Sequence, residues 1–114
     1  MQYHGSCHCG AVEYQVEGQL DSVLSCNCSI CSRRGYLLWF VPASALTFSK
    51  AGALTSYTFN SHKIKHQFCP VCGCAPFGLG VDPQGNQTAA VNVRCLTDVD
   101  LNALQVHHYN GKDA

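Results

Sequence analysis

The sequence predicts a mainly β protein in which loops between strands carry the cysteines. In residues 11–18, "AVEYQVEG", Val12, Tyr14 and Val16 alternate with polar residues, and Gly18 follows. A period of two is typical of a half-buried strand that ends at a glycine. No segment places apolar residues at helical spacing over three turns. We therefore expect strands as the main regular elements, with short helical turns at most.

The first half of the chain continues with a short apolar segment and a long one. Residues 23–26, "VLSC", lead into a group of cysteines. Residues 35–41, "GYLLWFV", are a continuous apolar run that is partly aromatic and β-branched, which predicts a buried strand. Pro42 ends this run, and residues 42–46 are expected to form a turn or one short helical turn.

The second half shows the same alternation of strands and turns. Strands are expected at residues 54–59, 64–68, 75–81, 88–96 and 104–109. The segments between them are a hairpin turn at 60–63, a cysteine loop at 69–73, a turn at 82–86 and one short helix at 97–103. Because the chain has no linker, repeat or low-complexity segment, we treat residues 1–114 as a single domain.

Charge and hydropathy exclude several classes of function. The chain has 7 basic and 7 acidic residues and no basic stripe, which argues against a nucleic-acid partner. No apolar run is long enough to cross a membrane, and the first residues do not resemble a signal peptide. We expect a soluble, cytoplasmic protein, and the sequence leaves its oligomeric state open.

Cysteine is the most informative residue type. The chain contains 9 cysteines, at positions 7, 9, 26, 28, 31, 69, 72, 74 and 95. Disulfides in a secreted domain are one interpretation, but the number is odd and no signal sequence is visible. Pairs two or three residues apart also suit a shared metal better than a mutual disulfide. We interpret the cysteines as reduced, metal-bound thiolates.

Four of these cysteines fit one closed zinc site. Cys69 and Cys72, in "FCPVCG", form a zinc knuckle with a glycine after the second thiolate. Cys7 and Cys9 are a second pair that is also followed by glycine, and Cys9 and Cys69 are 60 residues apart. A site made of both pairs would link two loops and stabilise a small core. The alternative is that Cys7 and Cys9 are buried small hydrophobic residues.

Three further cysteines predict a different kind of site. Cys26, Cys28 and Cys31 lie within "CNCSIC", a spacing that lets three thiolates hold one face of a metal. Three protein ligands with an open fourth position are typical of catalytic zinc. Three thiolates weaken the Lewis acidity of zinc but suit it to hold an added thiol as a nucleophilic thiolate. The alternative is a second structural zinc, closed by Cys74, Cys95 or His66.

The motifs "GSCHCGAVEY", "CNCSICSRRG", "HQFCPVCGCAPF" and "VNVRCL" resemble, in order and spacing, the glutathione-dependent formaldehyde-activating enzyme / centromere protein V family. The resemblance covers essentially the whole chain. It implies a β-tent, in which twisted antiparallel sheets are pinned by a structural zinc, with a second zinc near a surface cleft. It implies that the structural zinc is bound by Cys7, Cys9, Cys69 and Cys72, and the second zinc by Cys26, Cys28 and Cys31. The activity implied is that of a carbon–sulfur lyase which joins glutathione and formaldehyde into S-(hydroxymethyl)glutathione.

The leading hypothesis is therefore a zinc enzyme that adds glutathione, or a similar small thiol, to formaldehyde or a related small aldehyde. Arg33 and Arg34 directly follow the three-cysteine segment and are candidates for binding the carboxylates of the thiol. The alternative for both arginines is a solvated turn. A non-catalytic interaction module with two structural metals is the second hypothesis, and a metal buffer or redox sensor is the third.

Several other side chains have simpler interpretations. His8 lies between two proposed ligands, so its side chain is expected at the surface. His107 and His108 are adjacent on a predicted strand and must face opposite sides. Cys95 is interpreted as a buried thiol. Four aromatic residues are expected in the core: Trp39, Phe40, Phe48 and Phe77.

Overall fold

A computed structural model of the chain describes residues 1–51 and 54–113. The strands in these ranges are β1 (Gln2–Ser6), β2 (Glu13–Glu17), β3 (Ser22–Cys26), β4 (Leu38–Pro42), β5 (Leu46–Lys50), β6 (Thr55–Tyr57), β7 (Lys65–Phe68), β8 (Phe77–Val81), β9 (Gln87–Asn92) and β10 (Gln105–Tyr109). The helical elements are α1 (Ser29–Arg34) and the short 3-10 helices η1 (Ala43–Ala45), η2 (Val93–Cys95), η3 (Leu101–Ala103) and η4 (Gly111–Asp113). The protein is mainly β with short helical turns, as the sequence predicts.

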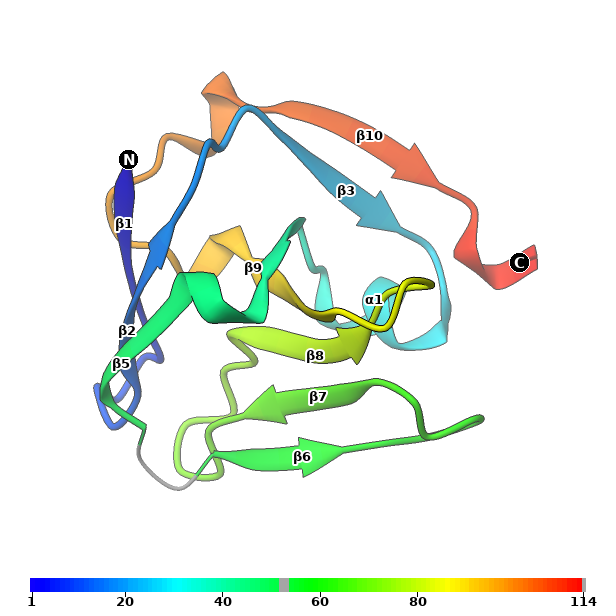
Figure 1. The fold of residues 1–114 in the computed structure, drawn as a ribbon, viewed down its shortest axis with the longest axis horizontal. Helices are drawn as coiled ribbons and strands as arrows, with labels where there is room; N and C mark the ends of the chain where they lie inside the picture. Colours follow the sequence, from blue (N-terminus) through cyan, green and yellow to red (C-terminus); the bar gives the residue numbers. More distant parts are fainter. Residues whose placement is uncertain (52–53, 114) are drawn as a thin grey trace.

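The strands form two sheets. The smaller sheet has the order β1-β2-β5, and the larger sheet has the order β10-β3-β4-β9-β8-β7-β6. Figure 1 shows the smaller sheet along one side of the molecule, while β3 and β10 lie above β8, β7 and β6. All pairings are antiparallel among the described strands except that of β10 with β3, which is parallel.

The main core lies between the two sheets. Tyr14 and Val16 of β2 are buried there together with Trp39 of β4 and Val91 of β9. Gly5 of β1 lies directly against the Tyr14 ring, and a Cβ at this position would collide with that ring. The alternating pattern in residues 11–18 therefore buries its apolar face as expected, and it also requires the smallest residue opposite the tyrosine.

A second, smaller apolar cluster lies around α1. Its buried members are Ile30 and Cys31 of α1, Tyr36 in the following segment and Ala75 before β8. The helix ends at Gly35, which has a φ of 68° and donates its backbone N–H to the Cys31 carbonyl at 2.9 Å. This left-handed glycine is a common helix C-terminus. The cluster fixes the orientation of the segment that carries Cys26, Cys28 and Cys31.

The sequence predictions of individual elements are confirmed in most places and wrong in a few. Strands β2, β4, β6, β7, β8 and β10 lie within or overlap their predicted ranges, and β9 ends at Asn92 rather than at residue 96. Strands β1, β3 and β5 and helix α1 were not predicted. Phe40 and Phe48 are 55% and 39% exposed, so their assignment to the core is wrong, whereas Trp39 and Phe77 are buried. Phe40 faces solvent because it alternates on β4 with the buried Trp39 and Val41.

In the part of the chain that the structure covers, none of the helices has the length and apolar character needed to cross a membrane.

Candidate metal centres

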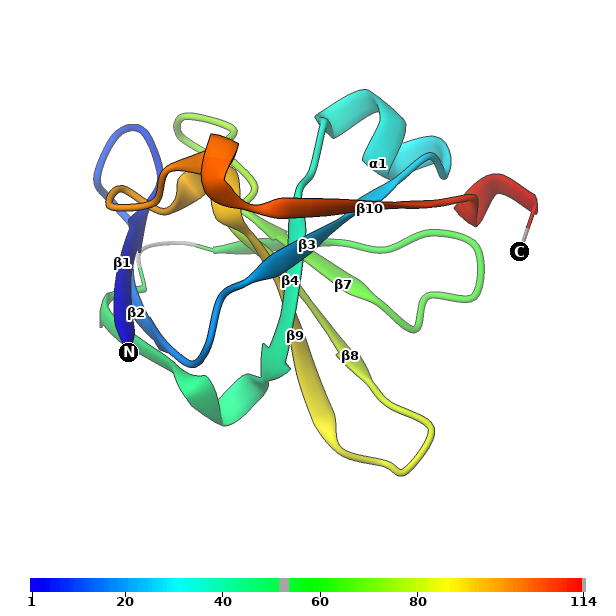
Figure 2. The ribbon, with the colours of Figure 1, turned by 90° about the horizontal axis from the view of Figure 1, so that it is seen from above.

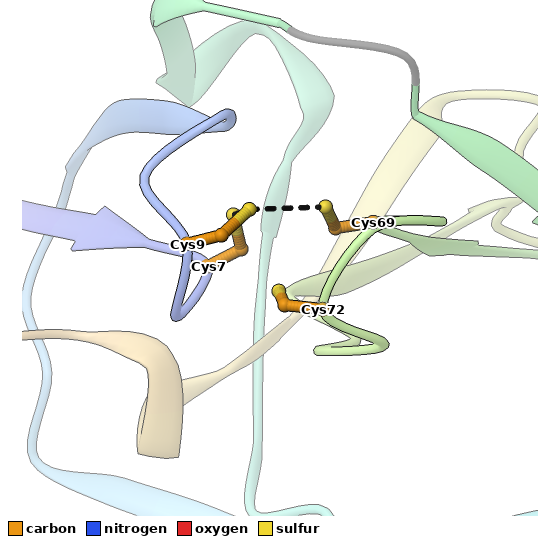
Figure 3. Close-up of side chains that lie close together, drawn as sticks. All are labelled: Cys7, Cys9, Cys69 and Cys72. Carbon is orange, nitrogen blue, oxygen red and sulfur yellow. Dashed lines mark hydrogen bonds between the residues drawn. The ribbon is translucent and has the colours of Figure 1, made fainter.

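Four cysteines from two distant loops come together as the sequence predicts. Cys7 and Cys9 lie between β1 and β2, and Cys69 and Cys72 lie between β7 and β8. Figure 3 shows their sulfur atoms turned toward one another across the gap between the two loops. The Cys7 and Cys9 sulfurs are 3.6 Å apart, and the Cys9 and Cys69 sulfurs are 3.7 Å apart. All four sulfurs lie within 4.8 Å of one another.

The two loops have the same local backbone conformation after their cysteine pairs. Gly10 follows the first pair with a φ of 81°, and Gly73 follows the second pair with a φ of 82°. The Gly10 N–H donates to the Cys7 carbonyl at 3.3 Å, and the Gly73 N–H donates to the Cys69 carbonyl at 2.8 Å. A left-handed glycine permits the sharp turn that brings both sulfurs of a pair to the same side. This explains why each cysteine pair in the sequence is followed by glycine.

The donor set of this four-cysteine site fits zinc. Four sulfurs bound at about 2.3 Å around a tetrahedral zinc lie about 3.8 Å from one another, close to the sulfur–sulfur distances found here. Hydrogen bonds from the backbone N–H groups of Cys74 and Cys9 lower the pKa of Cys72 to about 5. Cys7 and Cys69 are buried and Cys9 is exposed, so one side of the site faces solvent. The geometry is that of a closed structural site.

Cys74 lies beside this first site and not at the second one. The His8 backbone N–H acts to lower the pKa of Cys74, but burial and the neighbouring Cys72 thiol outweigh it, so the pKa is raised. His8 itself is exposed, as predicted.

The remaining three predicted ligands also come together. Cys26 ends β3, Cys28 is the residue before α1, and Cys31 lies within α1. Their sulfurs lie within 4.8 Å of one another. The Cys28 backbone N–H points at the Cys26 sulfur at a distance of 3.4 Å. The loop and the first turn of α1 thus turn all three side chains toward one point.

Two of these sulfurs differ in acidity. Burial opposes ionisation of Cys28, but hydrogen bonds from the Cys31 backbone N–H and from the Cys31 and Cys26 thiols hold its pKa below the usual value. Burial raises the pKa of Cys31, and the neighbouring Cys28 sulfur raises it further. The neighbouring groups therefore stabilise the thiolate form of Cys28 more than that of Cys31. A bound cation would stabilise the additional thiolates.

The structure also places the three candidates for a fourth ligand. His66 is buried, and its ring stacks on Phe59 at 5.5 Å and on Tyr36 at 6.5 Å between centroids. Cys95 lies near the Asn92 amide and the Ala75 carbonyl, 3.9 and 4.0 Å from its sulfur. Among residues 1–51 and 54–113, no further His, Cys, Asp or Glu joins the three sulfurs in a group with all ligand atoms within 4.8 Å.

Arg33 and Arg34 lie on α1 and not in a solvated turn. Both are exposed and line a surface hollow of about 400 Å³, together with Ser29, Ile30, Tyr57 and Phe59. The Arg34 Nη1 donates to the Tyr36 hydroxyl at 2.7 Å, and the Arg33 Nη1 donates to the Ser29 carbonyl at 2.8 Å. Ser29 and Ile30 stand between Cys28 and Cys31 in the chain. The hollow therefore adjoins the three-cysteine segment and carries two guanidinium groups.

Sequence reasoning missed several residues around this segment. Tyr36, Phe59 and Phe68 surround α1, and Asn27 holds the loop from the other side. The glycine after Arg34 was a usable signal for the end of a helix. The roles of Asn27 and Phe59 had no local signal, because Asn27 binds Asn110 and Lys112 near the end of the chain and Phe59 packs against the cluster around α1.

Comparison with known proteins agrees with this geometry. A sequence model of the family described as "Glutathione-dependent formaldehyde-activating enzyme" (GFA) matches residues 2–112. The chain belongs to the GFA family. A crystal structure of a Rhodobacter sphaeroides protein is similar to it, with a TM-score of 0.76 and 32% sequence identity over 94% of this chain and 100% of the other. Membership of the GFA family points to glutathione-dependent activation of formaldehyde, and both cysteine clusters could hold a metal ion.

Proposed function

We propose that this protein is a zinc-dependent carbon–sulfur lyase that joins glutathione, or a similar small thiol, to formaldehyde or a related small aldehyde. The observation that carries the proposal is the contrast between the two cysteine clusters. One has four sulfurs, whereas the other has three, with no fourth His, Cys, Asp or Glu among the described residues. A zinc with three protein ligands keeps a position for an added ligand. Family membership supplies the substrate class.

The donor chemistry at Cys26, Cys28 and Cys31 fits zinc, because thiolates are ligands that zinc prefers. A zinc bound by three thiolates would hold an added thiol in its thiolate form, which is the nucleophile. The protein contributes the rigid placement of its three sulfurs. Cys31 is buried in the apolar cluster around α1. Cys28 occupies the N-cap position of this helix, and its carbonyl accepts a hydrogen bond from the Ser32 N–H.

The reaction balances without a redox partner. The thiol loses its proton to solvent, and its sulfur attacks the carbonyl carbon of the aldehyde. A carbon–sulfur bond forms while the π electrons of the carbonyl move to oxygen, which takes a proton from water. The product is a thiohemiacetal, and the lyase direction reverses each step.

Arg33 and Arg34 are proposed to orient the thiol. Glutathione carries two carboxylates, and guanidinium groups bind carboxylates through paired hydrogen bonds. Neither guanidinium has a carboxylate partner within 4.0 Å among the residues that the structure describes. Both line the hollow next to the three-cysteine segment, so an anchored carboxylate would lie close to the thiol sulfur's binding position.

The test combines metal analysis with a thiol titration. Purified wild type is expected to contain two zinc ions per chain, and glutathione is expected to change the absorption of the cobalt-substituted protein at one of them. Exchange NMR with labelled formaldehyde then measures the rate of S-(hydroxymethyl)glutathione formation above the uncatalysed rate. Cys28→Ser should lose the glutathione response and the added rate while it keeps the first metal.

Cys95→Ser is the matched control, because Cys95 is a cysteine outside both clusters. It should retain two metals and the wild-type rate. If glutathione perturbs neither metal in wild type and adds no rate, the substrate assignment fails. A zinc-stabilised interaction module with two structural metals would then be the better description.

A further inference from the structure

The segment after β10 is brought to the three-cysteine loop by an unusual strand pairing. Strand β10 runs parallel to β3, and Tyr109 is paired in register with Cys26. Figures 1 and 2 show β10 beside β3, with the following turn near the loop that leads into α1. A parallel neighbour continues in the same direction as its partner. The chain therefore leaves β10 at the point where Cys26 leaves β3.

Asn27, which stands between two proposed ligands, binds this segment by three hydrogen bonds. Its backbone N–H donates to the Tyr109 carbonyl at 3.2 Å. Its side-chain Nδ2 donates to Asn110 Oδ1 at 2.9 Å, and its Oδ1 accepts from the Lys112 backbone N–H at 3.1 Å. Asn110 is held in turn, because its Nδ2 donates to Asp113 Oδ2 at 2.7 Å. Both ends of the Asn27 amide are therefore used.

Gly111 lies at the centre of this contact and touches the proposed metal ligands. A Cβ at Gly111 would collide with the Cys26 sulfur and lie 3.2 Å from the Cys28 Cβ. Glycine is required at position 111 because any larger side chain would collide with Cys26. Segment 109–113 therefore covers one side of the three-cysteine loop at van der Waals distance, where a larger residue would displace Cys26.

We propose that Asn27 and Asn110–Lys112 form a clasp that positions the Cys26 sulfur and makes one wall of the three-cysteine metal site. This inference rests on the proposed function, since it takes Cys26, Cys28 and Cys31 as metal ligands. Asn27 is a positioning residue, acting through the backbone on both sides of it. Gly111 keeps the wall thin enough for Cys26 to face the other two sulfurs.

Cys26 needs this support because the three proposed ligands come from different elements of the fold. Cys28 and Cys31 are fixed by α1, but Cys26 is at the end of β3, on the other side of Asn27. Without the clasp, the loop at Asn27 would be free to sample conformations in which Cys26 turns away. Contacts that orient metal ligands from outside the coordination sphere typically change metal affinity by about 10–100-fold. The same range is expected for loss of the clasp.

The experiment compares Asn27→Ala and Gly111→Ala with wild type by titration with cobalt under reducing, oxygen-free conditions. Wild type is expected to bind two cobalt ions, each with a thiolate-to-cobalt absorption. Both variants should bind the first cobalt with unchanged affinity and spectrum. They should bind the second about 10–100-fold more weakly, with an altered absorption. Asn86→Ala, an exposed asparagine in the β8–β9 turn, is the control and should match wild type.

The cobalt titration distinguishes a failure of the clasp proposal from a failure of the proposed function. If wild type binds two cobalt ions and both variants bind the second with wild-type affinity and spectrum, the clasp proposal is overturned and the proposed function stands. If wild type binds only the first cobalt, the proposed function fails and the clasp fails with it. Should Gly111→Ala not fold, Asn27→Ala still decides, because it removes hydrogen bonds without adding volume.

Discussion

Replacing Cys69 by serine is expected to unfold or severely destabilise the protein, whereas Cys28→Ser is expected to leave it largely folded. The Cys69 sulfur lies 3.7 Å from that of Cys9, which is 60 residues away in the chain. A metal at this site links the turn between β1 and β2 to the loop between β7 and β8, and thus the smaller sheet to the larger one. Among the described residues, Cys28 shares its cluster with Cys26 and Cys31 alone, and both are close to it in sequence.

The magnitude follows from the length of the loop that the site closes. In the chain-entropy treatment, a cross-link over the 60 residues between Cys9 and Cys69 stabilises the folded state by about 4 kcal/mol. Placing an unpartnered hydroxyl at Cys69, which is 1% exposed, costs a further ~1–3 kcal/mol. The sum is about 5–7 kcal/mol, against a total stability of about 5–15 kcal/mol for a typical domain. Cys28 is half-buried, and its replacement should cost about 1 kcal/mol.

Thermal unfolding of the zinc-loaded variants, followed by circular dichroism, measures the difference. Each kcal/mol corresponds to about 4 °C for a domain of 114 residues, so Cys69→Ser should lower the Tm by about 20 °C or more. Cys28→Ser should lower it by less than about 10 °C. Cys95→Ser serves as the control for a cysteine outside both clusters. If Cys69→Ser and Cys28→Ser melt alike, the division into a structural and a functional site is wrong.

Two further predictions concern single side chains. Arg34→Ala should raise the KM for glutathione about tenfold, which is equivalent to about 1.4 kcal/mol of lost carboxylate binding. The kcat should change less. An unchanged KM in steady-state kinetics would contradict the role proposed for Arg34. Burial raises the pKa of Cys95 from 9.0 to about 11, so the folded state keeps this thiol protonated at a pH where the unfolded chain already ionises it. The contribution of the protonated Cys95 thiol to the free energy of unfolding is fully present below pH 9.0. It is lost as pH rises through about 11, because the unfolded chain releases the proton first. Urea unfolding across this window should show the loss in wild type and a weaker dependence in Cys95→Ala.

The sequence predicted those parts of the fold that have a strong local pattern. Alternation in residues 11–18 identified β2, and the apolar run in residues 35–41 identified β4. Strands β1 and β5 were missed because neither has a clear apolar face: only Gly5 of β1 is buried, and four of the five residues of β5 are exposed. The parallel pairing of β10 with β3 had no local signal either, since it depends on the return of the chain from a distant part of the fold.

The cysteine clusters were predictable for a different reason. Ligand spacing is a local property, and a glycine after each pair marks the turn that brings two sulfurs together. The association of the pair at Cys7 with the pair at Cys69 followed from the number of ligands that a closed zinc site needs. The question of the fourth ligand at the second cluster required coordinates, because Cys74, Cys95 and His66 were equally compatible with the spacing. The structure places Cys74 beside the first cluster and His66 among aromatic rings.

The two clusters use the same residue type, but they depend on the fold in opposite ways. The four-cysteine site takes its sulfurs from loops of both sheets, so its geometry is set by the tertiary structure, and a metal bound there would contribute to that structure. The three-cysteine site takes all its ligands from residues 26–31, so its geometry is set by α1 on one side and by the clasp at Asn27 on the other. A metal bound at the second site, as proposed, would therefore be lost or exchange its added ligand while the sheets stay intact. The proposed function, in which this site binds and releases a thiol, requires such independence from global folding.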